Sequence, residues 1–217
     1  MEGLSGFWGQ SDFISRAVGL LMLAMSVSSW VIILWKGWLM RRVAGDIQRG
    51  IAAFWASADV AEGRARLVSL DRESMLLPLV DAALLQPGAG TLETQPALAS
   101  QLTRRLRDAL HAGLAQLQFG QVVLASTGAT APFIGLFGTV WGIFHALGSM
   151  AEGNGLTIDK IAGPVGEALI FTAAGLAVAI PAVLAYNVFG KRVAACEAEL
   201  EGFAHDLREM QLDSAAR

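Results

Sequence analysis

Between Asp108 and Glu152 the sequence contains no aspartate, glutamate, lysine or arginine. A helix crosses about 30 Å of hydrocarbon in about 20 residues, so this stretch is long enough to span a bilayer and to continue beyond it. Two further apolar runs occur, an uncharged one over 17–35 and one over 163–189 that is interrupted only by Glu167. The sequence therefore predicts three transmembrane helices.

The composition agrees with a membrane protein and excludes several other classes. Hydrophobic residues make up 54% of the chain and charged residues only 16%, against about 25% charged in soluble domains. The net charge of −3 and the scattered arginines give no basic stripe for nucleic acid, so we expect no nucleic-acid partner. Cys196 is the only cysteine, which excludes an intramolecular disulfide, and we expect no metal site.

The expected fold class is all-α, with three transmembrane helices and a large helical cytoplasmic loop between the first and second. The second and third helices are expected to be long and to extend into the cytoplasm. Because residues 98–126 contain no proline and lead into the second span, one unbroken helix is predicted from about Pro96 to Met150. The predicted order is an outer-face N-terminal segment, either an interfacial helix or a partly ordered leader, over 1–16, a first transmembrane helix over 17–39, the cytoplasmic helical loop over 40–121, a second transmembrane helix over 122–150, a periplasmic hairpin over 151–162, a third transmembrane helix over 163–189 and a cytoplasmic C-terminal helix over 190–217.

The distribution of lysine and arginine predicts the orientation. Ten of them lie between Lys36 and Gln121, whereas the hairpin over 151–162 contains only Lys160. Positively charged residues are enriched in cytoplasmic loops. We therefore expect a multi-pass inner-membrane protein with a periplasmic N-terminus and a cytoplasmic C-terminus.

Small residues follow a regular spacing in the second and third predicted spans. Helices in lipid associate largely through close backbone approach, which glycine permits. Three glycines of the second span are separated by three and four residues and so share one face, and prolines are tolerated where neighbouring helices satisfy the freed carbonyls. The predicted helix-packing residues are Pro132, Gly135, Gly138, Gly142, Gly175 and Pro181.

Polar side chains inside the spans are the candidate functional residues. Counted from the charges of the hairpin, Thr139 and Thr172 lie at one level, roughly 18 to 20 Å deep, and His145 and Glu167 lie roughly 10 Å deep. An ionisable group at the centre of a span costs at least ~2.5 kcal/mol and usually faces a bundle interior or water. We therefore predict a polar pore wall that includes both threonines and Glu167, with His145 as a relay or outer-mouth contact that can meet Glu167 within or between subunits.

Each of these residues also has a purely structural interpretation. A buried threonine commonly hydrogen-bonds the backbone one turn back. Glu167 can form a structural ion pair or act as a hydrogen-bonded carboxyl group, and His145 can be a satisfied interfacial histidine.

Two segments carry a resemblance to a known family. "APFIGLFGTVWGI" and "GEALIFTAAGLAVAIPAVLAYNVF" resemble the signature segments of the second and third membrane helices in the proton-channel family of ExbB, TolQ and MotA, and the match is specific over about 125–189. The resemblance implies a homopentameric inner-membrane channel around the membrane helices of an ExbD-like or TolR-like partner, whose aspartate takes up and releases protons. It also implies that Thr139, Thr172 and Glu167 line or support the pore.

Within the family the segments are closer to ExbB than to TolQ, and MotA usually has four spans rather than three. The expected function is a proton-channel subunit of an inner-membrane motor that energises outer-membrane transport with ExbD-like and TonB-like proteins. A TolQ-like role with TolR-like and TolA-like proteins in cell-envelope integrity is the first alternative, and a non-conducting membrane scaffold is the second. The chain has no P-loop, HExxH or GxSxG motif, so we expect no enzyme and no cofactor. The resemblance implies H⁺ as the transported ion, and the apolar spans imply membrane lipids as surroundings.

Overall fold

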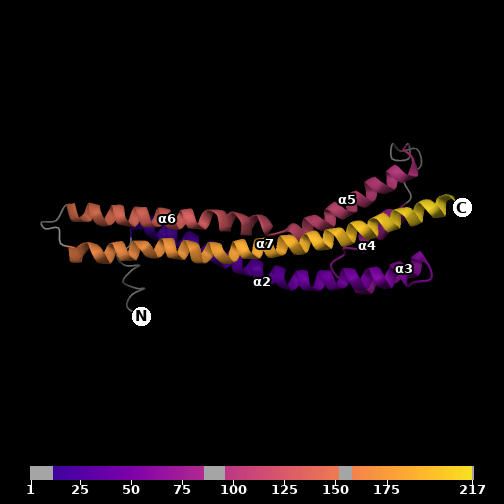
Figure 1. Cartoon of the computed structure of the whole chain (residues 1–217), viewed down its shortest axis with the longest axis horizontal. Coiled ribbons are helices and arrows are strands. Elements are labelled where there is room, and N and C mark those ends of the chain that lie inside the picture. The colour runs from indigo at the N-terminus through magenta and orange to yellow at the C-terminus, as the bar shows by residue number, and fades with distance from the viewer. Residues whose placement is uncertain (1–11, 86–95, 152–157, 217) are drawn as a thin grey trace. The chain divides into compact units, whose positions relative to one another are not determined.

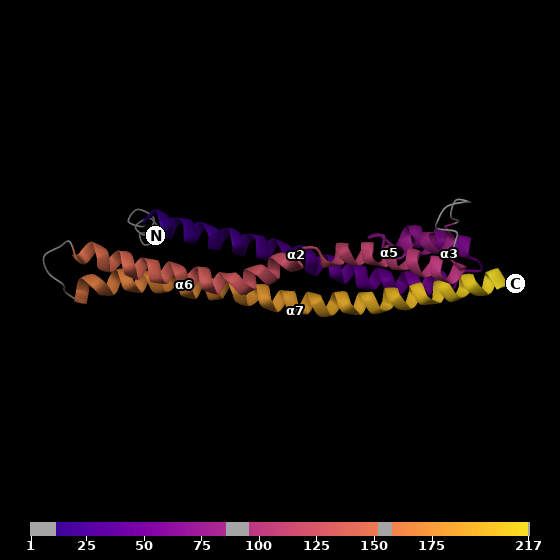
Figure 2. The same ribbon diagram turned by 90° about the horizontal axis from the view of Figure 1, so that it is seen from above.

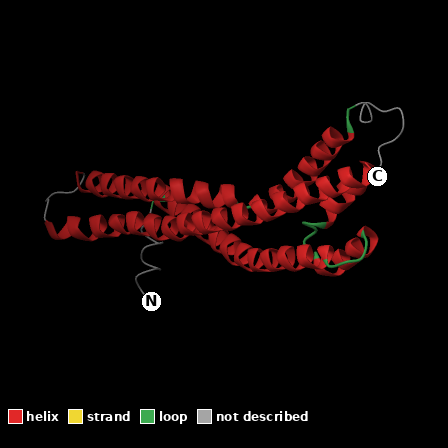
Figure 3. Cartoon of the chain, turned by 45° about the vertical axis from the view of Figure 1, so that its right-hand side comes forward, coloured by secondary structure: helices red, strands yellow, loops and turns green. Residues whose placement is uncertain are grey.

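The computed structural model describes residues 12–85, 96–151 and 158–216, and no strand occurs in these ranges (Figure 3). The helices are α2 (Phe13–Trp55), α3 (Val60–Leu70), α4 (Leu77–Leu84), α5 (Leu98–Gln118), α6 (Gln121–Ala151) and α7 (Ile158–Ala216), labelled in Figure 1. Three stretches are long and apolar enough to cross a membrane: Phe13–Trp55, Gln121–Gly148 and Ala162–Ala216. The predicted all-α class, with three candidate spans and a large helical segment between the first two, is confirmed.

The chain divides into two compact units. Unit 1 contains the residues up to Trp35 together with Gly120–Val188, and unit 2 contains Lys36–Phe119 together with the residues from Phe189 onward. Helices α2 and α7 each contribute to both units, and the chain passes from one unit to the other at three positions.

Unit 1 consists of the first part of α2, α6 and the first part of α7. Figures 1 and 2 both show α6 beside this part of α7. Val18 and Met22 of α2 form a small buried cluster with Phe171 of α7. Burial of apolar side chains on only one side of each helix leaves many large hydrophobic residues exposed, including Phe133, Val140 and Ile180. Such exposure is what a helix surrounded by lipid or by other spans requires.

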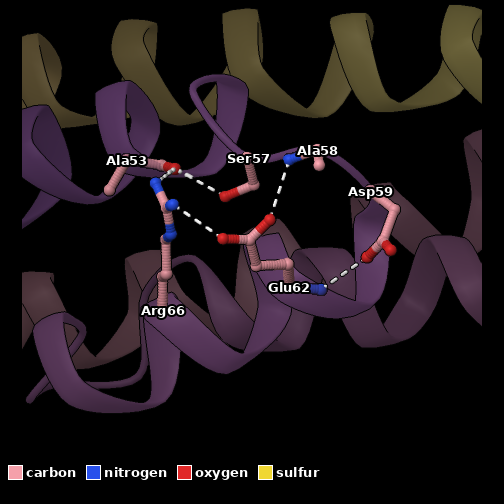
Figure 4. Close-up of polar contacts among 6 residues, drawn as sticks. All are labelled: Ala53, Ser57, Ala58, Asp59, Glu62 and Arg66. Atoms are coloured by element: carbon pink, nitrogen blue, oxygen red, sulfur yellow. Dashed lines mark hydrogen bonds and ion pairs between the residues drawn. The ribbon is translucent and has the colours of Figure 1, made fainter.

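Unit 2 is built from amphipathic helices. In α5 the buried leucines recur every three or four residues, as the inner face of a helix requires; they are Leu102, Leu106, Leu110, Leu114 and Leu117. The Asp71 carboxylate binds the backbone just before and at the start of α4. Its two oxygens accept the backbone N–H groups of residues 75–77 at 2.7–2.8 Å. Helix α3 begins with a capping box, in which Asp59 accepts the N–H of Glu62 at 2.7 Å and Glu62 accepts the N–H of Ala58 at 2.9 Å (Figure 4).

The prediction of one unbroken helix from Pro96 to Met150 is wrong. Helix α5 ends at Gln118 and α6 begins at Gln121. Between them Gly120 has φ +79°, a left-handed conformation that glycine adopts without a steric penalty. A Cβ atom at this position would lie 2.9 Å from Cγ2 of Ile32, so the local packing also favours glycine.

Candidate functional site

The two predicted threonines meet in unit 1. Thr139 of α6 and Thr172 of α7 place their Oγ1 atoms 2.6 Å apart. Thr139 Oγ1 also lies 3.1 Å from the carbonyl oxygen of Gly135 and 3.1 Å from that of Ala168. Each hydroxyl carries one proton, so one threonine donates to its partner and the other donates elsewhere. The result is a polar link across an otherwise apolar pair of helices.

Thr139 makes two kinds of contact, one with its own helix and one with α7, and its place in a pore wall stays a prediction. The contact with Gly135, four residues earlier, is the backbone bond expected of a structural threonine. The contact with Thr172 extends the network to the other helix. Thr139 is only 6% exposed, whereas Thr172 is partly exposed. In a single chain Thr172 is therefore the member of the pair with access to its surroundings.

Glycines allow the two helices to approach closely enough for this contact. A Cβ atom on Gly135 would lie 2.5 Å from the carbonyl oxygen of Phe171, and one on Gly175 would lie 2.7 Å from the carbonyl oxygen of Ala131. These obstacles are backbone atoms, so a side-chain rotation cannot relieve the clash. On Gly142 the nearest atom would be Cβ of Ala168 at 2.9 Å.

The remaining predicted packing residues lie in the same helices. A Cβ atom on Gly138 would lie 2.8 Å from the Phe171 ring and 3.0 Å from Val18 of α2. Pro132 lies inside α6 and Pro181 inside α7. Each proline lacks an N–H and so leaves the carbonyl four residues earlier without its helical donor.

Glu167 does not join the threonine pair within this chain. It lies five residues before Thr172 in α7, which at about 100° per residue turns the two side chains about 140° apart. Its side chain is exposed. The predicted pore residues therefore separate, in one chain, into a buried hydroxyl pair and a carboxyl group on another face of α7.

His145 is also exposed, and no hydrogen bond or ion pair joins it to Glu167 in the described part of the chain. It lies instead close enough to Asp12 to influence that carboxylate. Contact between His145 and Glu167 of different subunits stays a prediction.

Sequence reasoning missed Asp12. Its Oδ1 accepts the N–H of Phe13 at 2.7 Å at the start of α2, and its Oδ2 accepts the Trp141 indole N–H at 2.9 Å. The Trp141 hydrogen bond is the main cause that lowers the pKa of Asp12, and His145 acts in the same direction. An aspartate directly before an apolar run is an N-terminal helix signal that could have identified the first contact.

Comparison with known proteins gives a consistent result. The family model described as the MotA/TolQ/ExbB proton channel family matches residues 78–202, a range that includes Thr139, Glu167 and Thr172. The chain is 36% identical to the biopolymer transport protein ExbB of Xanthomonas campestris pv. campestris, covering 91% of this chain and 82% of the relative. It is 37% identical to ExbB of Neisseria meningitidis, covering 90% and 91%. It is 32% identical to the Tol-Pal system protein TolQ of Pseudomonas aeruginosa, covering 84% and 80%.

Proposed function

Since the chain belongs to the MotA/TolQ/ExbB proton channel family, we propose that it is the channel subunit of an inner-membrane motor that uses the proton motive force to energise transport at the outer membrane. The observation that carries this proposal is the contact between the Thr139 and Thr172 hydroxyls across α6 and α7. Polar groups inside membrane spans are expensive and commonly mark ion paths.

In the proposed mechanism Thr139 positions the hydroxyl group of Thr172 through a hydrogen bond. The buried Thr139 hydroxyl is bound to carbonyls of both helices, so it fixes the position of the partly exposed Thr172 hydroxyl. Because Thr139 donates to a carbonyl in this arrangement, the Thr172 proton is directed to Thr139, and the Thr172 oxygen can accept from water or from a partner's protonated carboxyl group. A ring of such hydroxyls keeps a protonatable carboxylate hydrated, and Glu167 adds negative charge near the outer mouth.

The proposed partner is an ExbD-like single-span protein inside the channel. We propose that a TonB-like protein uses the energy released by proton passage. Relatives named ExbB are 32–37% identical to the chain, and those named TolQ are 28–32% identical. A TolQ-like subunit with TolR-like and TolA-like partners in cell-envelope integrity is the second candidate. Co-expression with each single-span protein, followed by native mass spectrometry, separates the two candidates. Retention of the TolR-like protein alone would favour the second.

We further propose that the chain forms a homo-oligomer, a pentamer by resemblance to the family. Two grooves of unit 2 that flank the C-terminal part of α7 support it. The groove between α5 and α7 is lined by Arg104, Arg107 and Arg208, and the groove between α2 and α7 is lined by Glu199 and Asp206. Arg208 follows Glu199 by nine residues, so the two project from opposite sides of α7 at about 100° per residue.

The two grooves also lie at about the same position along the axis of α7. Arg208 donates to Thr103 of the antiparallel α5 at 3.0 Å, so Arg107, one turn further along α5, lies about level with Ala204 of α7. Asp206 is only two residues from that level. Identical chains placed head to tail around an axis bring opposite sides together at equal height, so the basic groove of one copy would meet the acidic groove of the next.

The other features of the proposal follow from its function. The N-terminus and the hairpin are periplasmic, and unit 2 with the C-terminus is cytoplasmic. The subunit is not an enzyme and uses no cofactor, and the transported ion is H⁺. A non-conducting scaffold would share this topology, so measured proton flux is the test that separates it from a channel.

A further inference from the structure

Lys36, near the end of the predicted first span, is fully buried, with 0% of its surface exposed. Its Nζ donates to the carbonyl oxygens of Leu117 at 2.6 Å and Phe119 at 2.7 Å. Among the residues that the structure describes, no carboxylate forms an ion pair with it. The partners of this buried ammonium group are therefore backbone carbonyls more than 80 residues away in the sequence.

These carbonyls belong to the end of α5. The last carbonyls of a helix lack intrahelical donors and carry the negative end of the helix dipole. A lysine near a helix C-terminus can bind them, and hydrogen bonds from a charged donor are among the stronger ones. Lys36 therefore caps the C-terminus of α5 from another helix.

The same two carbonyls would have different partners in a continuous helix. In an α-helix each N–H bonds the carbonyl four residues earlier, so the N–H of Gln121 would bond Leu117 and that of Val123 would bond Phe119. In the structure the N–H of Leu124 bonds Gly120 at 3.2 Å as α6 begins. Lys36 thus binds the two acceptors that an unbroken helix would use for Gln121 and Val123.

The local sequence alone does not explain the break. No proline lies between Leu98 and Ala131, and a single glycine inside a helix is only mildly unfavourable. Gly120 permits the left-handed turn but does not require it.

We propose that Lys36 is the positioning residue that keeps α5 and α6 separate, and thereby fixes the residue at which α6 begins. When its ammonium group is removed, the carbonyls of Leu117 and Phe119 take the N–H groups of α6, and the two helices join into one. The register of α6 depends on this cap.

Hydrogen exchange of the full-length protein in lipid nanodiscs tests the proposal. In the wild type the amides of Gln121, Val122 and Val123 should exchange faster than those of the turns on either side, because first-turn N–H groups have no intrahelical acceptor. In Lys36→Met they should become at least about tenfold slower, and Lys36→Arg, which keeps the charged donors, should retain the wild-type pattern. Arg41→Met, which removes an exposed charge in the same helix, is the matched control and should change nothing at these amides.

Gly120→Ala provides an independent route to the same state. A Cβ atom is strained at φ +79° and would contact Ile32, whereas alanine favours a continuous helix. This variant should therefore slow the same three amides. Wild-type amides at 121–123 that are as protected as their neighbours would overturn the proposal, even if Lys36→Met does not fold. So would unchanged exchange in a folded Lys36→Met variant.

Discussion

Thr139 and Thr172, which lie 33 residues apart in the sequence, bring their hydroxyl oxygens within 2.6 Å of each other between α6 and α7. The contact depends on glycines at which the two backbones nearly touch, Gly135 and Gly175. Close helix packing and the polar link are thus one arrangement, because a wider helix spacing would separate the hydroxyls. Substitutions at the hydroxyls and at the glycines test this relationship separately.

The first prediction concerns coupling between the hydroxyls. Thr139→Val should lower the free energy of unfolding by about 1–3 kcal/mol, because it leaves Thr172 without its partner and removes the contacts with two carbonyls. Thr172→Val should cost less, because its hydroxyl is partly exposed. The double variant should lose less than the sum of the two single losses. Denaturation in detergent micelles measures all three values, and strictly additive losses would contradict the coupling.

The second prediction concerns helix spacing. Gly135→Ala should destabilise the α6–α7 pair by about 1–3 kcal/mol, because the added methyl group would lie 2.5 Å from a backbone oxygen. The matched control is Gly190→Ala in α7, where nothing lies within 4 Å of the added atom. The control should be neutral or stabilising by up to about 1 kcal/mol. Equal effects of the two substitutions in thermal unfolding would show that close approach at Gly135 is unimportant.

Much of this arrangement could be predicted from the sequence because its causes are local. Apolar runs of sufficient length identify the three candidate spans, and counting from the hairpin placed Thr139 and Thr172 at one level. The angle of about 140° between Glu167 and Thr172 around the axis of α7 also follows from the sequence, because it depends only on their spacing of five residues.

Other features depend on contacts that no local pattern reveals. At the break between α5 and α6, the Phe119 carbonyl accepts a hydrogen bond from Lys36, which lies 83 residues earlier in the sequence. The proline-free segment gives no sign of this contact, and the prediction of a continuous helix was therefore wrong. The Asp12–Trp141 hydrogen bond spans 129 residues. In both pairs, the residues next to one partner in the sequence do not indicate which distant residue it contacts.

The third prediction concerns the pH dependence of α3. The hydrogen bond from the Ala58 N–H, followed by that from Arg66, lowers the pKa of Glu62 from its ordinary value of 4.5. A carboxyl group whose pKa is lower in the folded state contributes stability above the unfolded pKa, and this contribution is lost as the pH falls through the folded pKa. Wild-type protein should therefore lose more thermal stability between about pH 6 and pH 3 than Glu62→Gln.

The control for this experiment is Glu201→Gln, an exposed carboxylate on α7 outside the capping box of Figure 4. It should retain the wild-type acid dependence. An unchanged acid dependence in Glu62→Gln would show that the capping box does not contribute to acid sensitivity.

The fourth prediction concerns contacts between copies. Arg107→Glu and Asp206→Lys should each weaken the homo-oligomer, because each places like charges in facing grooves. The two substitutions together should restore the contact with reversed polarity. Native mass spectrometry at low ionic strength measures the oligomer distribution. If the double variant did not recover the wild-type oligomer, this result would contradict contact between the two grooves of neighbouring copies.

The fifth prediction concerns Glu167. Glu167→Ala should abolish energised transport in cells while the oligomer still assembles, because the carboxyl group is exposed on α7 and lies outside the α6–α7 contact. Thr139→Val combined with Thr172→Val should have the same effect on transport. Transport assays paired with pull-down of the single-span partner distinguish loss of function from loss of assembly.

Proton flux in proteoliposomes is the most direct test of the central claim. The protein would be reconstituted with its single-span partner, a membrane potential applied and internal pH followed with a trapped dye. We predict potential-driven acidification that disappears in Glu167→Ala and in the double threonine variant, although both still form the complex. Flux no greater than in empty liposomes, or equal flux in wild type and both variants, would contradict a proton path through these residues.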